Sequence, residues 1–258
     1  MTSSDMSVVS GPPRAVYAVA VETLAGSVVR ALTGVDGAFR LADQLSPEAS
    51  PAQRKAGLAA VRVLGPDALT PFMLAAHRFG PDDAAVVIAS IDTFPPLGPE
   101  REPTDEDNTA IGKSVPVRAL RDWATGQVLS RLGVSDSARP FPAHSGTGLG
   151  HDRGWVARAA VLAQLSPLAS PWLNGPLVAD ARRYRLDVAR GVTRALLRRD
   201  YLTAARLTRW LAASGAALVN PPFLVRPVLR QLELVAEQDP RLLLEITLAR
   251  YGLGGGIE

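Results

Sequence analysis

The residues best suited to chemistry in this sequence form a short acidic run near its middle. Asp105, Glu106 and Asp107 follow one another directly, and Asn108 comes next. A carboxylic acid can be kept protonated by burial and by neighbouring carboxylates, because both disfavour its anion. The run therefore has the residue types of a general acid. The alternative is a solvated acidic loop, with Asp105 or Asp107 capping the first turn of a helix.

Helices predicted on both sides of this run must position it. Proline, serine or threonine at the start and glycine at the end mark most of them. The segment 84–91 has the composition of a strand, but its neighbours are helical, so we predict a buried helix there. Two irregular stretches, 93–104 and 134–152, are long enough to be functional or disordered. The predicted helices cover residues 13–34, 53–64, 72–79, 84–91, 116–132, 155–165, 177–199, 201–217, 223–237 and 241–251.

This pattern predicts an all-α protein. We expect one helical domain over residues 13–251, with a flexible N-terminus over 1–12 and a flexible tail over 252–258. Hydrophobic residues make up 47% of the 258 residues and the mean hydropathy is +0.10, which supplies apolar surface for a sizeable core or a lined cavity. A bundle, a solenoid and a closed double ring of paired helices all fit the pattern.

The composition excludes several kinds of site and partner. The chain has no cysteine, so disulfides, thiolate metal sites and cysteine nucleophiles are excluded. The net charge is +3, and the many arginines are spread over most helices. Since no basic stripe alternates with aromatic residues, we expect no nucleic-acid partner. No window reaches the length and purity of a membrane span and no leader pattern is visible, so we expect a cytoplasmic protein.

Three other motifs resemble sites for phosphate or metal. The segment 111–114 ends like a phosphate-binding loop, but Asp107 occupies the position of its required glycine. Asp82 and Asp83 resemble a magnesium-binding aspartate pair, but acidic residues at a helix start explain them better. His144, His151 and Asp152 match no established metal spacing. We therefore predict no metal site and no cofactor.

The order Asp-x-Asp-Asn-Thr-Ala at residues 105–110 resembles the Asp-x-Asp-Asp-Thr-Ala signature of class II terpene cyclases. The chain length, the helical pattern and the position of the motif are similar to those of the single-domain family that includes merosterolic acid synthase. The resemblance implies a single α6–α6 barrel. It also implies protonation of a linear polyprenyl substrate or its terminal epoxide, which starts cyclisation to a polycyclic terpenoid. The partner would be a hydrophobic isoprenoid, acquired through transient contact with a membrane surface.

The resemblance assigns roles within the acidic run. The middle aspartate of the family motif is the proton donor, which corresponds to Asp107, and Asp105 would share its proton network. Asn108 stands where the family has aspartate. Its amide could donate a hydrogen bond to one oxygen of Asp107 and so favour the other oxygen as the donor.

A cyclase also needs an apolar cavity whose aromatic faces stabilise carbocations without acting as bases. Trp155 and Trp172 are the best candidates, because they lie near helix starts beside loops. The full set of candidate pocket residues is Trp155, Trp172, Trp210, Phe94, Phe141, Tyr184 and Trp123.

Two other functions remain open on the sequence. A helical-repeat scaffold for a protein partner would present an exposed groove or an apolar surface patch. A ligand-binding domain would contain a cavity, as a cyclase does. The cyclase alone predicts a closed, deep apolar cavity with the Asp107 carboxyl pointing into it.

Overall fold

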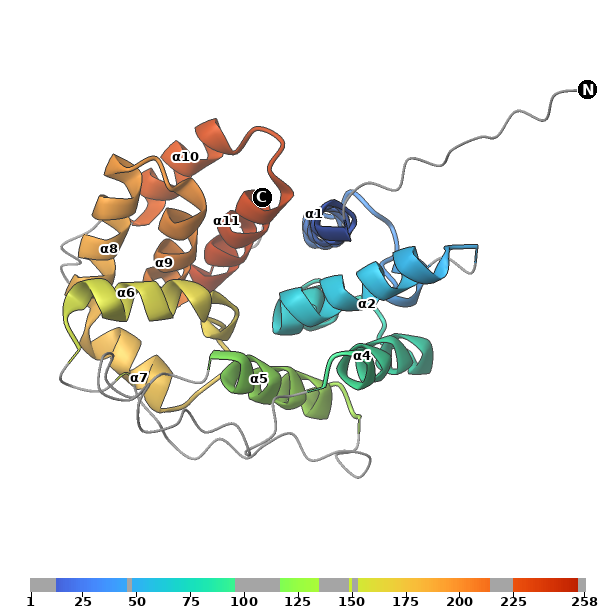
Figure 1. Ribbon diagram of the computed structural model, residues 1–258. Coiled ribbons are helices and arrows are strands. Elements are labelled where there is room, and N and C mark those ends of the chain that lie inside the picture. The colour runs from blue at the N-terminus through green and yellow to red at the C-terminus, as the bar shows by residue number, and fades with distance from the viewer. Residues whose placement is uncertain are drawn as a thin grey trace, which may run out of the picture.

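A computed structural model (Figure 1) describes residues 13–45, 48–95, 117–134, 149, 153–213 and 225–254. This part of the chain is helical and contains no strand, which confirms the all-α prediction. The α-helices are α1 (Pro13–Leu32), α2 (Pro51–Leu64), α3 (Thr70–Leu74), α4 (Pro81–Thr93), α5 (Val117–Arg131), α6 (Trp155–Gln164), α7 (Pro176–Arg183), α8 (Arg185–Leu197), α9 (Tyr201–Ala213), α10 (Val225–Ala236) and α11 (Pro240–Gly252). The described ranges also hold three 3-10 helices, η1 (Ala42–Gln44), η2 (Gly65–Leu69) and η4 (Ser166–Leu168).

Capping residues define the starts of several helices, as the sequence predicts. Ser50 accepts a hydrogen bond from the backbone of Gln53 at 3.3 Å, and the Gln53 side chain accepts one from the Ser50 backbone at 2.9 Å. This capping box satisfies two backbone donors that the first turn of α2 would leave unpaired. Asp239 caps α11 in a similar way, accepting from the backbone N–H groups of Arg241 and Leu242.

Two predicted helices differ from the observed ones. The sequence pattern predicts one helix over 177–199, but this stretch forms α7 and α8, which meet at Tyr184. There the Arg158 guanidinium stacks on the Tyr184 ring at 3.7 Å, a tertiary contact that local sequence does not reveal. The helix predicted over 72–79 ends at Leu74, because Ala76 adopts a left-handed φ of 56°. The turn brings His77 back toward Ala31.

The helices bury two groups of apolar side chains. The first group is formed mainly by α1 to α4, and the second by α6 to α10. α5 and α11 contribute to both groups, and α11 does so with different faces: Leu244 and Leu248 enter the first group, while Leu242 and Ile246 enter the second. Because α11 is apolar on all sides, it can be buried between the two halves of the molecule. In Figure 1 it lies between α1 and α9.

Among the described residues one helix, α1, is long and apolar enough by composition to cross a membrane, in contrast to the prediction that no window is suited to a span. A core helix of a soluble protein passes the same test, so the observation is weak evidence for a membrane span. In the fold, Leu24, Ala25 and Val28 of α1 are at most 2% exposed and belong to the first core group.

Gly191 in α8 lies where helices of the second core group pack closely together. A Cβ built there would lie 2.8 Å from both the Ala159 Cβ and the Leu207 Cδ1. We expect Gly191→Ala to lower the free energy of unfolding by roughly 1–3 kcal/mol, because overpacking outweighs the better helix propensity of alanine. Gly26→Ala in α1 is the matched control, since its Cβ would meet no atom closer than 3.7 Å. Urea denaturation should show a lower midpoint for Gly191→Ala, and an unchanged or higher midpoint for Gly26→Ala.

Candidate functional site

The residues of the predicted acid site lie outside the part of the chain that the structure describes. These are Asp105, Asp107 and Asn108, and the same holds for Phe141 among the aromatic candidates. Their predicted roles therefore stay predictions. The histidine candidates His144 and His151 and the neighbouring Asp152 also lie outside the described ranges.

The six described aromatic candidates occupy separate surroundings, and none of them lines the cavity described below. Trp210 is 1% exposed, and its indole N–H donates to the Leu162 carbonyl at 2.7 Å, as in a core residue. Trp172 packs against both core groups, and Trp123 packs against the second. Phe94 follows α4, where its carbonyl accepts from Arg62 Nε at 3.0 Å.

Trp155 and Tyr184 each present a ring face to an arginine. The Arg194 guanidinium lies 5.8 Å from the Trp155 ring, and that of Arg158 lies 3.7 Å from the Tyr184 ring. Trp155 also lines an open groove of about 630 Å³ along α8. The ring faces of Trp155 and Tyr184 therefore already interact with positive charges of the protein itself, those of the two arginines.

The aspartate pair at the start of α4 has the structural role expected from the sequence. Asp83 accepts hydrogen bonds from the backbone N–H of Gly80 at 3.0 Å and from that of Ala42 at 3.1 Å. Asp82 forms an exposed ion pair with Arg40. Within the described residues no cluster of three or more His, Cys, Asp or Glu side chains could hold a metal ion.

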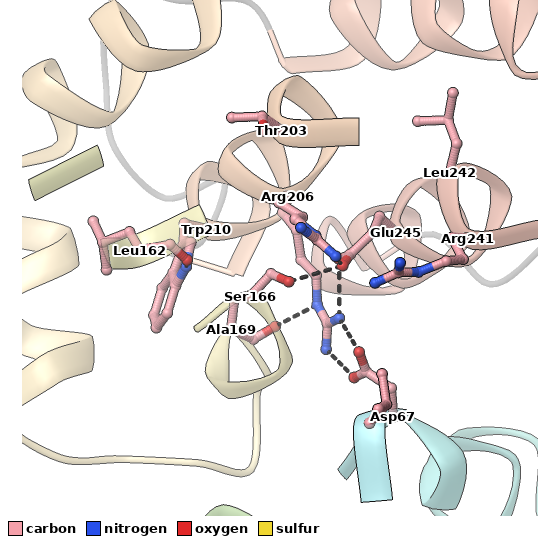
Figure 2. Close-up of polar contacts among 12 residues, drawn as sticks. Asp67, Leu162, Ser166, Ala169, Thr203, Arg206, Trp210, Arg241, Leu242 and Glu245 are labelled. Carbon is pink, nitrogen blue, oxygen red and sulfur yellow. Dashed lines mark hydrogen bonds and ion pairs between the residues drawn. The ribbon is translucent and has the colours of Figure 1, made fainter. Parts of the chain in front are cut away.

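A buried polar network surrounds Arg209 in α9 (Figure 2). The side chain is 1% exposed and donates to both carboxylate oxygens of Asp67, with Nη2–Oδ1 at 2.7 Å and Nη1–Oδ2 at 2.9 Å. Nη1 also donates to Glu245 Oε2 at 3.2 Å, and Nε donates to the Ala169 carbonyl at 3.1 Å. The network thus joins η2, α9 and α11, which are far apart in the sequence.

Glu245 has two further partners on its other oxygen. The Ser166 hydroxyl donates to Oε1 at 2.8 Å, and Arg206 Nε donates to the same oxygen at 3.3 Å. Both carboxylates of the network are therefore already paired within the protein. A buried carboxylate needs such partners, because an unpaired buried charge is costly.

Local sequence places these groups. Gly65 ends α2 with a φ of 57° and a ψ of −125°, and its N–H bonds to the Val61 carbonyl. A side chain at this position would be strained, so glycine permits the sharp change from α2 to η2, which carries Asp67. Arg206 and Arg209 are three residues apart in α9, and this spacing brings both toward the same neighbour, Glu245.

A cavity of about 140 Å³ lies beside the network. Three arginines from three helices line it: Arg121 from α5, Arg206 from α9 and Arg241 from α11. The other polar lining residues are Asp67, Glu245, Gln164 and Ser166, and the apolar ones include Val63, Val117 and Leu244. An engineered cavity of ~150 Å³ can hold a molecule as small as benzene. This cavity therefore fits a small ionic group and is too small for a polyprenyl chain.

The three arginines that line the cavity are incompletely paired. Arg121 donates from Nη2 to the Val63 carbonyl, but its Nε is buried and has no hydrogen-bond partner within the described residues. Figure 2 draws no interaction from the Arg241 guanidinium to the other residues shown, although this residue and Glu245 line the same cavity. Arg206 contacts Glu245 through Nε alone. The cavity therefore has guanidinium N–H groups available for a ligand.

Burial and mutual repulsion destabilise the charged forms of two of these arginines. Burial is the largest cause of the lowered pKa of Arg121. The positive charges of Arg206 and Arg241 lower this pKa further, whereas the negative charge of Asp67 raises it. Burial also lowers the pKa of Arg241, and Arg206 again adds to the effect. An anion bound among the three would relieve this repulsion.

The surroundings also shift the pKa values of Asp67 and Arg209. Burial raises the pKa of Asp67 above its ordinary value, and Glu245 adds to the rise, whereas the charge and hydrogen bonds of Arg209 lower it. The pKa of Arg209 is raised by Asp67 and Glu245 in spite of its burial. Arg209 therefore remains charged and forms ion pairs with both carboxylates.

The charges at the site do not cancel. Four guanidinium groups, those of Arg121, Arg206, Arg209 and Arg241, meet the carboxylates of Asp67 and Glu245, which leaves a surplus of two positive charges. This balance covers the cavity and the Arg209 network; outside them, the negative charges of Asp239 and Glu22 also act on Arg241 and partly offset the surplus. A partly enclosed surplus of this kind favours binding of an anion.

This site is not predicted from the sequence, because its arginines are spread along the chain in the pattern of surface or salt-bridge residues. One signal was available: Glu245 is a single acidic residue inside the apolar run from Leu242 to Leu248. A lone carboxylate inside an otherwise largely apolar run is expected to be buried and paired. Its partner Arg209 could not be identified from spacing alone.

No family model, curated protein or solved structure matches the chain. The functional conclusion therefore rests on the geometry of the site.

Proposed function

We propose that this protein binds a small anionic ligand in the cavity lined by Arg121, Arg206 and Arg241. The observation that carries the proposal is the convergence of three guanidinium groups from three helices, beside carboxylates that are already paired. Arginine forms strong, charge-assisted hydrogen bonds with anionic oxygens, often two at a time. Low solvent access strengthens these contacts relative to the same contacts in water.

Equilibrium dialysis of the whole chain against radiolabelled inorganic phosphate, at constant ionic strength, tests the proposal. We expect saturable binding of one phosphate per chain. Arg241→Gln should weaken this binding at least about tenfold, the effect of losing ~1.4 kcal/mol of charge-assisted hydrogen bonding. Arg190→Gln removes the same charge from an exposed position on α8, where the side chain is 54% exposed, and should leave binding unchanged.

Two results would contradict the proposal. One is the absence of saturable binding to the wild-type protein. The other is an equal loss of binding in Arg241→Gln and Arg190→Gln, because general charge attraction to a basic protein would then explain the signal.

We propose a second candidate function on the basis of the acidic run. The order of residues 105–110 supports a class II terpene cyclase with Asp107 as general acid, Asp105 and Asn108 as its neighbours, and a single α6–α6 barrel. The all-helical fold is compatible with this proposal. Its isoprenoid substrate would need a cavity larger than the one between Arg121 and Arg241, and would reach it from a membrane surface.

Incubation with linear polyprenyl substrates, with and without a terminal epoxide, tests the cyclase. Cyclic products are expected from the wild-type protein and should disappear in Asp107→Asn, because the amide has no acidic proton to donate. Cyclic products that persist in Asp107→Asn would remove Asp107 as the acid. If neither substrate gives cyclic products, the cyclase proposal fails and the anion-binding proposal is unaffected.

A further inference from the structure

We infer that the anionic group held between Arg121, Arg206 and Arg241 is a terminal phosphoryl group with two negative charges, belonging to a phosphate monoester. The inference rests on the proposed function and names the ligand class for that site. It depends on three features of the cavity: its charge, the directions from which its donors come, and its size.

The surplus of two positive charges matches a dianion. A carboxylate would neutralise one of them and leave the remaining guanidinium groups in mutual repulsion at short range. A phosphoryl monoester carries a charge of about −1.5 to −2 at neutral pH and offers three strong acceptor oxygens. It can therefore neutralise the site more completely than a monoanion can.

The donors converge from separate elements. Arg121, Arg206 and Arg241 belong to α5, α9 and α11, and the Gln164 side chain adds a further polar group from the end of α6. A planar carboxylate has two oxygens in one plane and can engage two such arginines well. The three terminal oxygens of a tetrahedral phosphoryl group can each face a different arginine.

The size and opening of the cavity fit the end of a larger molecule. Its volume of about 140 Å³ accommodates a phosphoryl group but lies below the ~300 Å³ at which pockets for whole organic ligands begin. One wall reaches the surface: Val63 is 40% exposed and the Arg206 side chain is 24% exposed. The ester oxygen can point to this side, where Val63 and Val117 offer apolar surface to the organic part.

Isothermal titration calorimetry with four small probes tests the inference. The probes are inorganic phosphate, phenyl phosphate, dimethyl phosphate and benzoate, each titrated into the whole chain at pH 8 and constant ionic strength. We expect phenyl phosphate to bind one per chain and at least as tightly as inorganic phosphate. Dimethyl phosphate and benzoate carry one charge and two free oxygens, so both should bind at least about tenfold more weakly. In Arg241→Gln the dissociation constants for phenyl phosphate and benzoate should lie within about threefold of each other, because the variant reduces the surplus charge to one.

The outcomes separate this inference from the proposed function. Benzoate that binds as tightly as phenyl phosphate would overturn the phosphoryl assignment and leave anion binding intact. Binding of inorganic phosphate without phenyl phosphate would overturn the monoester and identify a site for a free oxyanion. If none of the four probes binds, the proposed function and this inference fall together.

Discussion

Replacing Arg209 by methionine is expected to lower the free energy of unfolding by roughly 3–5 kcal/mol, because it leaves buried carboxylates without their main partner. Asp67 and Glu245 have side chains that are 4% and 7% exposed, so water cannot replace the guanidinium. Asp67 loses both of its hydrogen bonds to Arg209. The Arg209–Asp67 hydrogen bonds also link segments 142 residues apart, one beside each core group. Their loss should therefore weaken the packing of one half of the molecule against the other.

Two further variants show whether charge or packing causes the loss. Arg30→Met is the matched control, because the Arg30–Asp36 pair has an arginine that is 50% exposed and should contribute at most about 1 kcal/mol. Arg209→Met combined with Asp67→Leu should recover part of the stability, since the unpaired carboxylate is removed as well. Urea denaturation measures all three. An Arg209→Met variant that unfolds at the wild-type urea concentration would contradict a structural role for the network.

Replacing Arg241 by glutamine is expected to separate stability from binding. Without ligand, the variant should be as stable as the wild type or more stable by up to about 1 kcal/mol, because one of three repelling charges is removed. In phosphate at 100 times Kd, the wild type should gain ~2.7 kcal/mol from ligand binding. The variant should gain much less.

Thermal unfolding in chloride and in phosphate at equal ionic strength checks this second prediction. The wild type should unfold at a higher temperature in phosphate than in chloride, and Arg241→Gln should show little difference between the two salts. Arg190→Gln should behave like the wild type, since the Arg190 side chain is 54% exposed and does not line the cavity. A phosphate effect of the same size in all three proteins would indicate a general salt effect on the folded surface.

Helix starts were the part of the fold most accessible from the sequence, because their signals are local. Ser50, Gln53 and the prolines at the first turns act on their own backbone neighbours, so their effect can be predicted from spacing alone. The break at Tyr184 could not be predicted in this way, since it coincides with stacking of Arg158 from another helix. Tertiary contacts therefore decided where a continuous helical pattern was interrupted.

The candidate site depended on such contacts throughout. Asp67, Arg209 and Glu245 come from three distant segments, and no spacing rule links a 3-10 helix after α2 to the middle of α9. The lone Glu245 in an apolar run could have been recognised as buried, but its partners could not. By contrast, the acidic run at Asp105–Ala110 drew attention through residue order alone, and its roles stay predictions because it lies outside the described ranges.

A crystal structure of the protein with selenate tests whether Arg121, Arg206 and Arg241 together hold a tetrahedral dianion. Selenate resembles a doubly charged phosphoryl group, and its selenium can be located by anomalous scattering. We predict one selenium peak in the cavity beside Asp67 and Glu245, with selenate oxygens about 3 Å from guanidinium nitrogens of all three arginines. An empty cavity at saturating selenate, or selenium bound only at exposed arginines such as Arg190, would contradict the claim.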